Sequence, residues 1–367
     1  MTEPAVPADL APVVASAPEA VGRSAPGARV VGIDLARGVA LLSMFVAHTA
    51  PSAGPGGVLM LSEYFPFPLF VMLLGAGAEF VGRRTRVARH AVESLVRAAC
   101  LLLVGWALTF AGAQVFVVLG AMALAAALGW LLAVLPSWVL TLAAVMGVAV
   151  TAWWNETVTE WRLDLLVAGR TDLLEWVNLV LSPAYPAPYV LALAALGVVT
   201  ARVLHPRPGR GAAPSPKVLA CIATTTGLVG VGILAAHRVG VIEAGADSFG
   251  WATTVASVAL AVAAWSLAEW GARVAPRITA PLAAAGCMSF TLYSLHVVWL
   301  GYWARELFPG RPDDAWVNVV GMSVLALLLG VTWQALRLPG RWWRGPLEGA
   351  VGSLAGAAGR LTPARGR

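Results

Sequence analysis

The sequence has little charge. Asp, Glu, Lys and Arg make up only 12% of its 367 residues, while hydrophobic residues make up 59%. Soluble domains are about 45–50% apolar, so the composition excludes an ordinary soluble protein. The net charge of +6 would suit a nucleic-acid partner in a soluble chain, but here the arginines fall in short loops between apolar runs. They report membrane topology, and we expect no nucleic-acid partner.

The sequence also lacks the cysteine spacing of a metal site or disulfide framework, and it lacks the pattern of a signal peptide. The three cysteines, Cys100, Cys221 and Cys287, lie inside apolar runs and have no CxxC or histidine-rich spacing. This arrangement argues against a disulfide framework and against a metal site, and we predict neither. Residues 1–28 lack a basic start followed by an apolar core, so we expect no signal peptide there. Their Ala-, Pro- and Val-rich composition predicts a disordered cytoplasmic tail.

Apolar runs of membrane-spanning length are what the sequence does contain. A spanning helix needs about 20 residues, and about 10 runs approach that length. The sequence thus predicts an all-α, polytopic transmembrane helix bundle in the plasma membrane, with residues 29–340 as its membrane domain. The least certain assignment is 113–137, where two runs are joined without charges to orient them. The predicted spans are 30–50, 60–81, 94–112, 114–134, 137–154, 186–204, 218–237, 249–270, 281–303 and 315–338.

Basic residues alternate between the loops. With a cytoplasmic N-terminus, the inside segments carry most of the arginines, and the few outside arginines are offset by nearby acids. The positive-inside rule then predicts that both termini are cytoplasmic, with 341–367 as a C-terminal tail. The longest outside segment, 154–188, has apolar residues at helical spacing, which predicts an amphipathic helix on the outer surface or over a chamber.

The first span combines membrane length with ionisable side chains. Asp34, Arg37 and His48 share one stripe, because eleven residues at about 100° each bring Arg37 and His48 within roughly 20° around the axis. A rise of about 1.5 Å per residue makes the stripe roughly 20 Å long, with Asp34 and Arg37 near the cytoplasmic face and His48 near the outer face. Such groups usually face a protein-lined or watery cavity, so this helix is predicted to form one wall of a chamber.

A second unusual span, 281–303, carries Ser289, Tyr293 and His296. It runs in the same direction as the first, which places His296 at a depth comparable with that of His48. A lone histidine is more often a hydrogen-bonded packing residue, but two at one depth predict a shared cavity, and histidine moves protons at neutral pH. The second span returns with Glu63 outside, as a partner for His48, and with Glu79 inside, as a partner for Arg37.

The Asp34–Arg37 pair has two interpretations. It is either an ion pair that stabilises the helix start and reaches the headgroups, or part of a cofactor site. In the second case Arg37 and the loop arginines Arg83, Arg84 and Arg86 bind a phosphate-bearing cofactor from the cytoplasm, since guanidinium groups suit phosphates.

Several motifs resemble those of the transmembrane acyltransferase superfamily, which includes acyltransferase-3, YeiB-like and heparan-α-glucosaminide N-acetyltransferase families. The first span, D-x-x-R-G-x-A with a histidine fourteen positions after the Asp, is similar to the first helix of that superfamily. G-x-x-S-F-x-L-Y-x-x-H, 286–296, resembles a late helix of the acyltransferase-3 group. RGPLEG, 344–349, resembles the C-terminal GPLE of YeiB-like proteins, and SEYFPFPLFVMLLGAG, 62–77, resembles the second helix of the glucosaminide acetyltransferases.

The resemblance implies a membrane enzyme that takes an acyl group, commonly acetyl, from a cytosolic coenzyme A thioester and passes it to a hydroxyl or amine of an envelope glycan or lipid-linked acceptor. His48 would be the general base, because no second histidine follows in the loop after the first helix to form an acetyl-histidine relay. His296 and Glu63 would support it. The acyl-coenzyme A site would comprise Asp34, Arg37, Arg83, Arg84 and Arg86, with the arginines binding the phosphates.

Two other classes of function stay open. A proton-coupled transporter of a small polar or lipid-linked molecule also uses a chamber with Asp, Arg and His, although we see no inverted repeat. A non-catalytic membrane partner protein is the third class. The sequence identifies neither the acceptor nor the oligomeric state, so a homo-oligomer also stays open.

Overall fold

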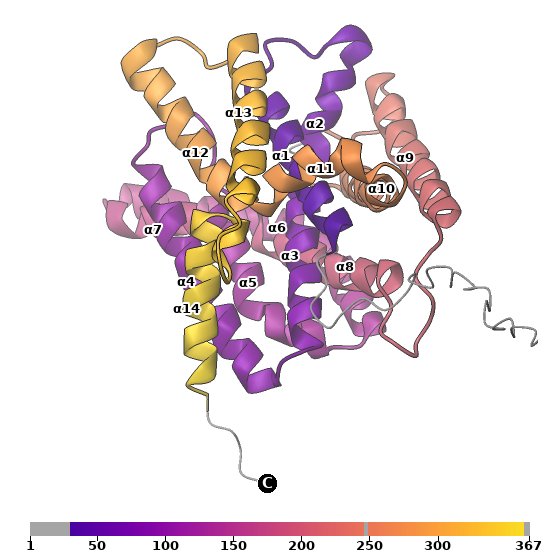
Figure 1. The fold of residues 1–367 in the computed structure, drawn as a ribbon. Coiled ribbons are helices and arrows are strands. Elements are labelled where there is room, and N and C mark those ends of the chain that lie inside the picture. The colour runs from indigo at the N-terminus through magenta and orange to yellow at the C-terminus, as the bar shows by residue number, and fades with distance from the viewer. Residues whose placement is uncertain (1–29, 246–248, 363–367) are drawn as a thin grey trace, which may run out of the picture. The chain divides into compact units, whose positions relative to one another are not determined.

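The computed structural model describes residues 30–245 and 249–362, and the predicted disordered tail, 1–28, lies outside these ranges. The described residues form helices and the loops between them, with no strand in either range (Figure 1). The predicted all-α fold class is therefore confirmed. We call the end of the bundle at Thr49 the outer end and the end at Val31 the inner end, after the predicted orientation, which stays a prediction.

Eight segments of the described chain are long and apolar enough to cross a membrane, which makes the protein an integral, multi-pass membrane protein. The second of them combines η1 (Pro55–Met60), α2 (Leu61–Tyr64) and α3 (Pro66–Gly82). The other seven are α1 (Val31–Thr49), α4 (Val87–Thr109), α6 (Ser137–Val167), α8 (Ala187–Leu204), α9 (Pro216–Arg238), α10 (Trp251–Val274) and α13 (Trp316–Ala335).

A bent pair of helices is the candidate for a ninth span. The helices α11 (Pro276–Cys287) and α12 (Ser289–Tyr302) meet at Met288 with a bend of 68°. The sequence predicts one continuous helix over 281–303, so the break is a correction. The π-helical turn η2 (Trp303–Leu307) follows α12.

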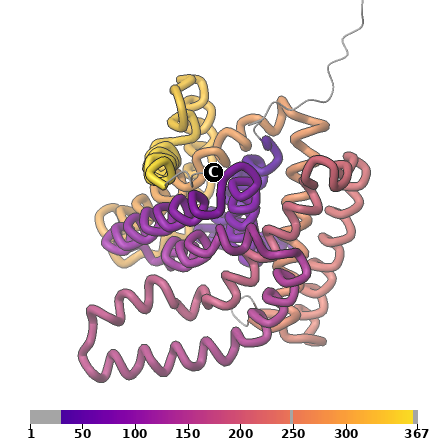
Figure 2. Tube along the Cα trace, turned by 90° about the horizontal axis from the view of Figure 1, so that it is seen from below, coloured from indigo at the N-terminus to yellow at the C-terminus, as the bar shows by residue number. Residues whose placement is uncertain are grey.

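The region 113–137 differs from the prediction of two full spans. The helix α5 (Leu119–Val134) has 16 residues, fewer than the 20 or so that cross a bilayer. The helix α6 has 31 residues and continues well past its predicted end at 154. It turns back through α7 (Thr171–Val180), and the two form a hairpin (Figure 2). The predicted amphipathic segment 154–188 is thus mostly helical, but its helical part is divided mainly between α6 and α7, and 181–186 form a turn.

Glycine allows α1 and α11 to cross in close contact. A Cβ atom on Gly286 would collide with the backbone oxygen of Asp34, and one on Gly38 would collide with the backbone oxygen of Leu282. Small residues let helix backbones approach closely inside membranes. These two glycines, one in each motif that carries a histidine, bring the two histidine-bearing segments together.

A buried apolar cluster around the outer half of α1 fixes the helices that carry the histidines. It joins α1 to α4, α5, α11, α12 and α13 and excludes water from their contacts. Its members are Leu41, Met44, Phe45, Leu108, Val118, Leu119, Ala285, Met288, Leu292, Tyr293, Val297, Leu300, Met322 and Ala326.

The segment predicted as a C-terminal tail is structured as far as residue 362. The turn η3 (Trp342–Arg344) leads into α14 (Pro346–Arg360), which packs along α4 (Figure 1). Glu348 of α14 reaches the break between α11 and α12. Its carboxylate accepts hydrogen bonds from the backbone N–H groups of Phe290 and Thr291 at 2.7 and 3.1 Å, and from the Thr291 hydroxyl at 2.6 Å. The first N–H groups of a helix have no acceptor within that helix, and Glu348 supplies acceptors for those of α12.

Candidate functional site

The two predicted histidines meet at the outer half of the bundle. Nδ1 of His48, from α1, lies 3.3 Å from Nε2 of His296, from α12, and their ring centroids are 5.5 Å apart. His296 is 2% exposed, whereas His48 is half-buried. The ring of His296 is therefore the more buried of the two.

Hydrogen bonding assigns a tautomer to each neutral ring. Nδ1 of His296 lies 2.6 Å from the backbone oxygen of Tyr293, which can only accept, so this nitrogen carries the proton. Nε2 of His296 is then an acceptor, and Nδ1 of His48 must donate to it. The lone pair of His48 consequently lies on Nε2, for which the described residues provide no hydrogen-bond partner. The arrangement leaves His48 as the ring that can take a proton.

Aromatic packing and a further hydrogen bond fix the buried ring. The rings of Phe45 and Tyr293 lie 5.4 and 5.1 Å from that of His296, measured between centroids. The backbone N–H of Val118, just before α5, donates to the Tyr293 hydroxyl at 3.1 Å. Tyr293 thus orients His296 through its carbonyl and connects α12 to the start of α5 through its hydroxyl. The sequence marks Tyr293 by its spacing, but it does not reveal this double role.

Glu63 lies on α2 with its side chain exposed, and the neighbouring Tyr64 is buried. The hydrogen-bond chain through the two histidines is complete without a carboxylate, since the Tyr293 carbonyl occupies the position of an orienting group. The role of Glu63 in supporting His48 stays a prediction.

The inner end of α1 carries the predicted ion pair. Nη1 of Arg37 lies 3.4 Å from Oδ1 of Asp34, and the Arg37 side chain is 31% exposed. A second arginine, Arg344 of the C-terminal segment, is exposed and lies within electrostatic range of both Arg37 and Asp34. We call the two arginines the Arg37–Arg344 group.

The three loop arginines have different surroundings. Arg84 and Arg86 are exposed, but Arg83 turns towards the bundle, where its Nε donates to Glu79 at 3.0 Å. Glu79 also binds Arg202 and Arg207, so the predicted pairing of Glu79 with Arg37 is wrong. Helical spacing gave Glu79 the right depth but could not tell which helices face it.

Two functional candidates were missed by the sequence reasoning, Arg344 and Glu348. Both lie in RGPLEG, where the signal was a motif resemblance without a structural role attached. The structure gives them separate positions, Arg344 within electrostatic range of Arg37 and Glu348 at the break before α12.

No protein-family model matches the chain, and no curated protein matches it either. Family membership is therefore not shown. What stands is a polytopic helical membrane protein with a histidine pair at one end of α1 and a basic group at the other.

Proposed function

We propose that this protein is a membrane acyltransferase that moves an acyl group from acyl-coenzyme A, such as acetyl-coenzyme A, to a hydroxyl or amine of an extracytoplasmic glycan or lipid-linked acceptor. The observation that carries the proposal is the hydrogen-bond chain from the Tyr293 carbonyl through His296 to His48, which leaves the lone pair on Nε2 of His48 without a partner among the described residues. This is the arrangement a general base needs.

In the proposed reaction, Nε2 of His48 takes the proton from the acceptor O–H or N–H while the oxygen or nitrogen attacks the thioester carbonyl. The carbon–sulfur bond breaks, and the coenzyme leaves as a thiolate that receives the proton from the His48 imidazolium. His296 accepts from Nδ1 of His48 throughout and holds the ring in place. General-base catalysis of this kind contributes about 10²–10⁴-fold, and positioning of the two substrates supplies much of the rest.

The coenzyme phosphates would bind at the inner end, beside Arg37 and Arg344. Guanidinium groups bind phosphate in a bidentate manner and stay charged. The same helix connects this group with His48, so an extended pantetheine arm along α1 would join the two ends. Arg84 and Arg86 are exposed and available for the same anion, whereas Arg83 is engaged by Glu79.

The test follows the acyl label. Membranes that contain the protein are given acetyl-coenzyme A labelled in the acetyl group, and the label is measured in extracted lipid and glycan fractions together with released coenzyme A. We expect His48→Ala to lower transfer by at least about 100-fold while binding of a coenzyme A analogue is retained. His237→Ala, which removes an imidazole at the end of α9, serves as the control and should transfer normally. Full transfer by folded His48→Ala would refute the mechanism.

A second candidate function is proton-coupled transport, which the broken span favours. Discontinuous helices at a polar site are common in secondary transporters, and here the 68° bend between α11 and α12 lies just before Tyr293 and His296. Counterflow of a labelled solute in sealed vesicles, without release of coenzyme A, would support transport over transfer.

A further inference from the structure

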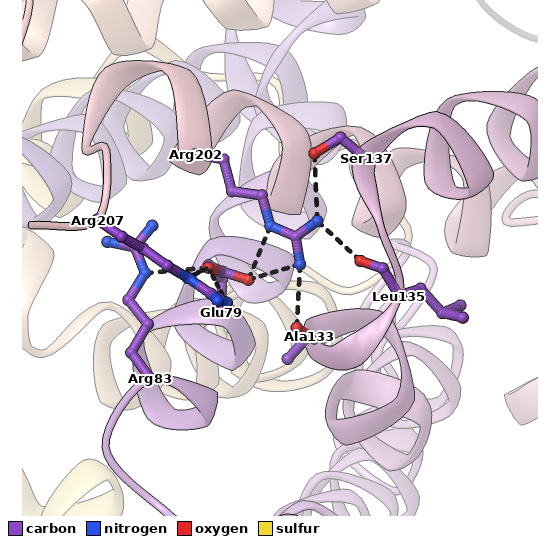
Figure 3. A network of polar contacts seen from close by, with 7 residues as sticks. All are labelled: Glu79, Arg83, Ala133, Leu135, Ser137, Arg202 and Arg207. Atoms are coloured by element: carbon purple, nitrogen blue, oxygen red, sulfur yellow. Dashed lines mark hydrogen bonds and ion pairs between the residues drawn. The ribbon is translucent and has the colours of Figure 1, made fainter. Parts of the chain in front are cut away.

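A buried carboxylate at the inner end of α3 gathers three arginines (Figure 3). Glu79 is fully buried, and its two oxygens receive five N–H groups: one from Arg83, two from Arg202 and two from Arg207, at 2.9–3.1 Å. A carboxylate offers about four lone-pair positions, so Glu79 has no capacity left. Three guanidinium groups thus share one saturated carboxylate, and the cluster keeps an excess of two positive charges.

Every N–H group of the Arg202 guanidinium donates a hydrogen bond within the protein. Beyond Glu79, it donates to the backbone oxygens of Ala133 and Leu135 at 3.0 and 2.8 Å and to the Ser137 hydroxyl at 3.2 Å. All five N–H groups of a guanidinium are thereby occupied. Arg202 ties the end of α8 to the end of α5 and the start of α6, which is a structural role.

Arg83 and Arg207 each keep N–H groups without an acceptor among the described residues. Nη2 of Arg83 is buried and has no hydrogen-bond partner among the described residues. Arg207 spends its Nε and Nη2 groups on Glu79, and its side chain is 39% exposed. Both arginines donate to the same oxygen of Glu79, so their guanidinium groups are neighbours.

The two other buried glutamates in the described ranges, Glu93 and Glu269, do not neutralise this excess, because each is paired with cations of its own. Glu93 binds Arg89 at 2.8 Å and Arg97 at 3.4 Å. Glu269 of α10 binds His205 at 3.0 Å and lies 3.8 Å from Arg273. It is therefore occupied by cations of its own. A buried guanidinium donor without an acceptor is costly, so the cluster needs an anion from outside the chain.

We propose that Arg83 and Arg207 form a binding site for a phosphate group, supplied by the headgroup of an anionic phospholipid. Arg83 directly follows α3, and Arg207 lies three residues after α8, so the pair sits where two spanning helices end. Lipid phosphates lie at this level, and basic pockets between helix ends bind anionic headgroups. A phosphate oxygen would accept from the free donors of Arg207 and, after a small side-chain shift, from Nη2 of Arg83. The site is separate from the Arg37–Arg344 group and does not depend on the proposed acyl transfer.

The experiment compares the full chain in nanodiscs of phosphatidylcholine alone with nanodiscs that also contain phosphatidylglycerol. Thermal unfolding reports stabilisation, and native mass spectrometry counts the phosphatidylglycerol molecules that stay bound. We expect phosphatidylglycerol to raise the Tm of the unmodified chain. Arg207→Gln should lose most of that rise and should retain one phosphatidylglycerol fewer. Arg210→Gln removes the same charge from the same exposed linker and should behave like the unmodified chain.

Equal shifts and equal lipid counts in all three proteins would overturn the site, since they would indicate general attraction to a negative surface. If inorganic phosphate, added to phosphatidylcholine nanodiscs, gives the whole shift, the lipid assignment is overturned in favour of a soluble phosphate. Arg83→Gln provides a second variant should Arg207→Gln fail to fold. It should show the same loss, because both arginines contribute to one site.

Discussion

The two polar clusters of this bundle differ in whether a proton acceptor is left unpaired. At the outer half, a chain of hydrogen bonds runs from the Tyr293 carbonyl through His296 to His48 and ends at a nitrogen with no partner among the described residues. At the inner end, Glu79 accepts five hydrogen bonds and is saturated. Both clusters place polar atoms among apolar helices, but only the first leaves its terminal group available for chemistry.

This difference gives the Glu79 cluster a structural role and leaves the histidine pair as the candidate site. Glu79 joins α3 to the end of α8 and to the following linker, and its partner Arg202 extends the contacts to α5 and α6. A charge that is buried and paired from several elements holds those elements together. A neutral histidine at the end of a hydrogen-bond chain holds much less together and can change its protonation. Variants of the two clusters should therefore affect stability in one case and activity in the other.

The largest expected effect is on stability. Glu79→Ala would leave three arginines without their common carboxylate, and removing one partner of a buried charge cluster costs about 3–5 kcal/mol. We expect the apparent Tm in detergent to fall by on the order of 10 °C. Asp172→Ala removes an exposed carboxylate, 72% exposed and 3.6 Å from Arg170, and should change the Tm little. Similar Tm values for the two variants would show that Glu79 does not hold the surrounding helices together.

A smaller effect is expected on rate. His296→Gln removes the ring that accepts from His48 but leaves the base itself. A lost hydrogen bond of about 1 kcal/mol corresponds to a decrease in transfer of about five- to tenfold, far less than the loss expected for His48→Ala. The measurement is the same labelled transfer assay. A His296 variant as inactive as His48→Ala would indicate that His296 reacts directly.

The smallest effect is expected on the pH dependence of stability. Burial raises the pKa of the Glu348 carboxyl above its ordinary value of 4.5, although three hydrogen bonds oppose the shift. The folded protein then binds this proton more tightly than the unfolded chain does, so stability falls as the pH rises from about 4.5 through the raised pKa. Glu348→Gln cannot ionise and should flatten this part of the curve of Tm against pH. An unchanged slope in the variant would show that other groups cause it.

The histidine site could be predicted from the sequence because it depends on two regular quantities. Helical periodicity places His48 on the stripe of Arg37, and the direction of the spans places His296 at a matching depth. The structure confirms that the two rings meet. The tautomers could not be predicted, because they depend on the Tyr293 carbonyl, whose distance from His296 only the three-dimensional structure gives.

The arginine contacts and the broken span could not be predicted, because distant segments determine them. Glu79 is paired by Arg202 and Arg207, from another helix and the linker after it. Nothing in the sequence around Met288 requires a break. Glu348, more than fifty residues later, satisfies the N–H groups that the break exposes. Periodicity gives the face and the depth of a side chain, but not the neighbouring helix.

The cap on α12 also sets an order of events during synthesis. A chain is made from its N-terminus, and its early parts begin to fold before later parts exist. His48 and His296 are both translated before Glu348, yet the first turn of the helix that carries His296 has its acceptors only when Glu348 arrives. The spans can therefore enter the membrane early, while the first turn of α12 must wait for α14 before it is capped. A chain interrupted between α13 and α14 would contain every residue of the histidine pair but would lack the cap on the helix that carries His296.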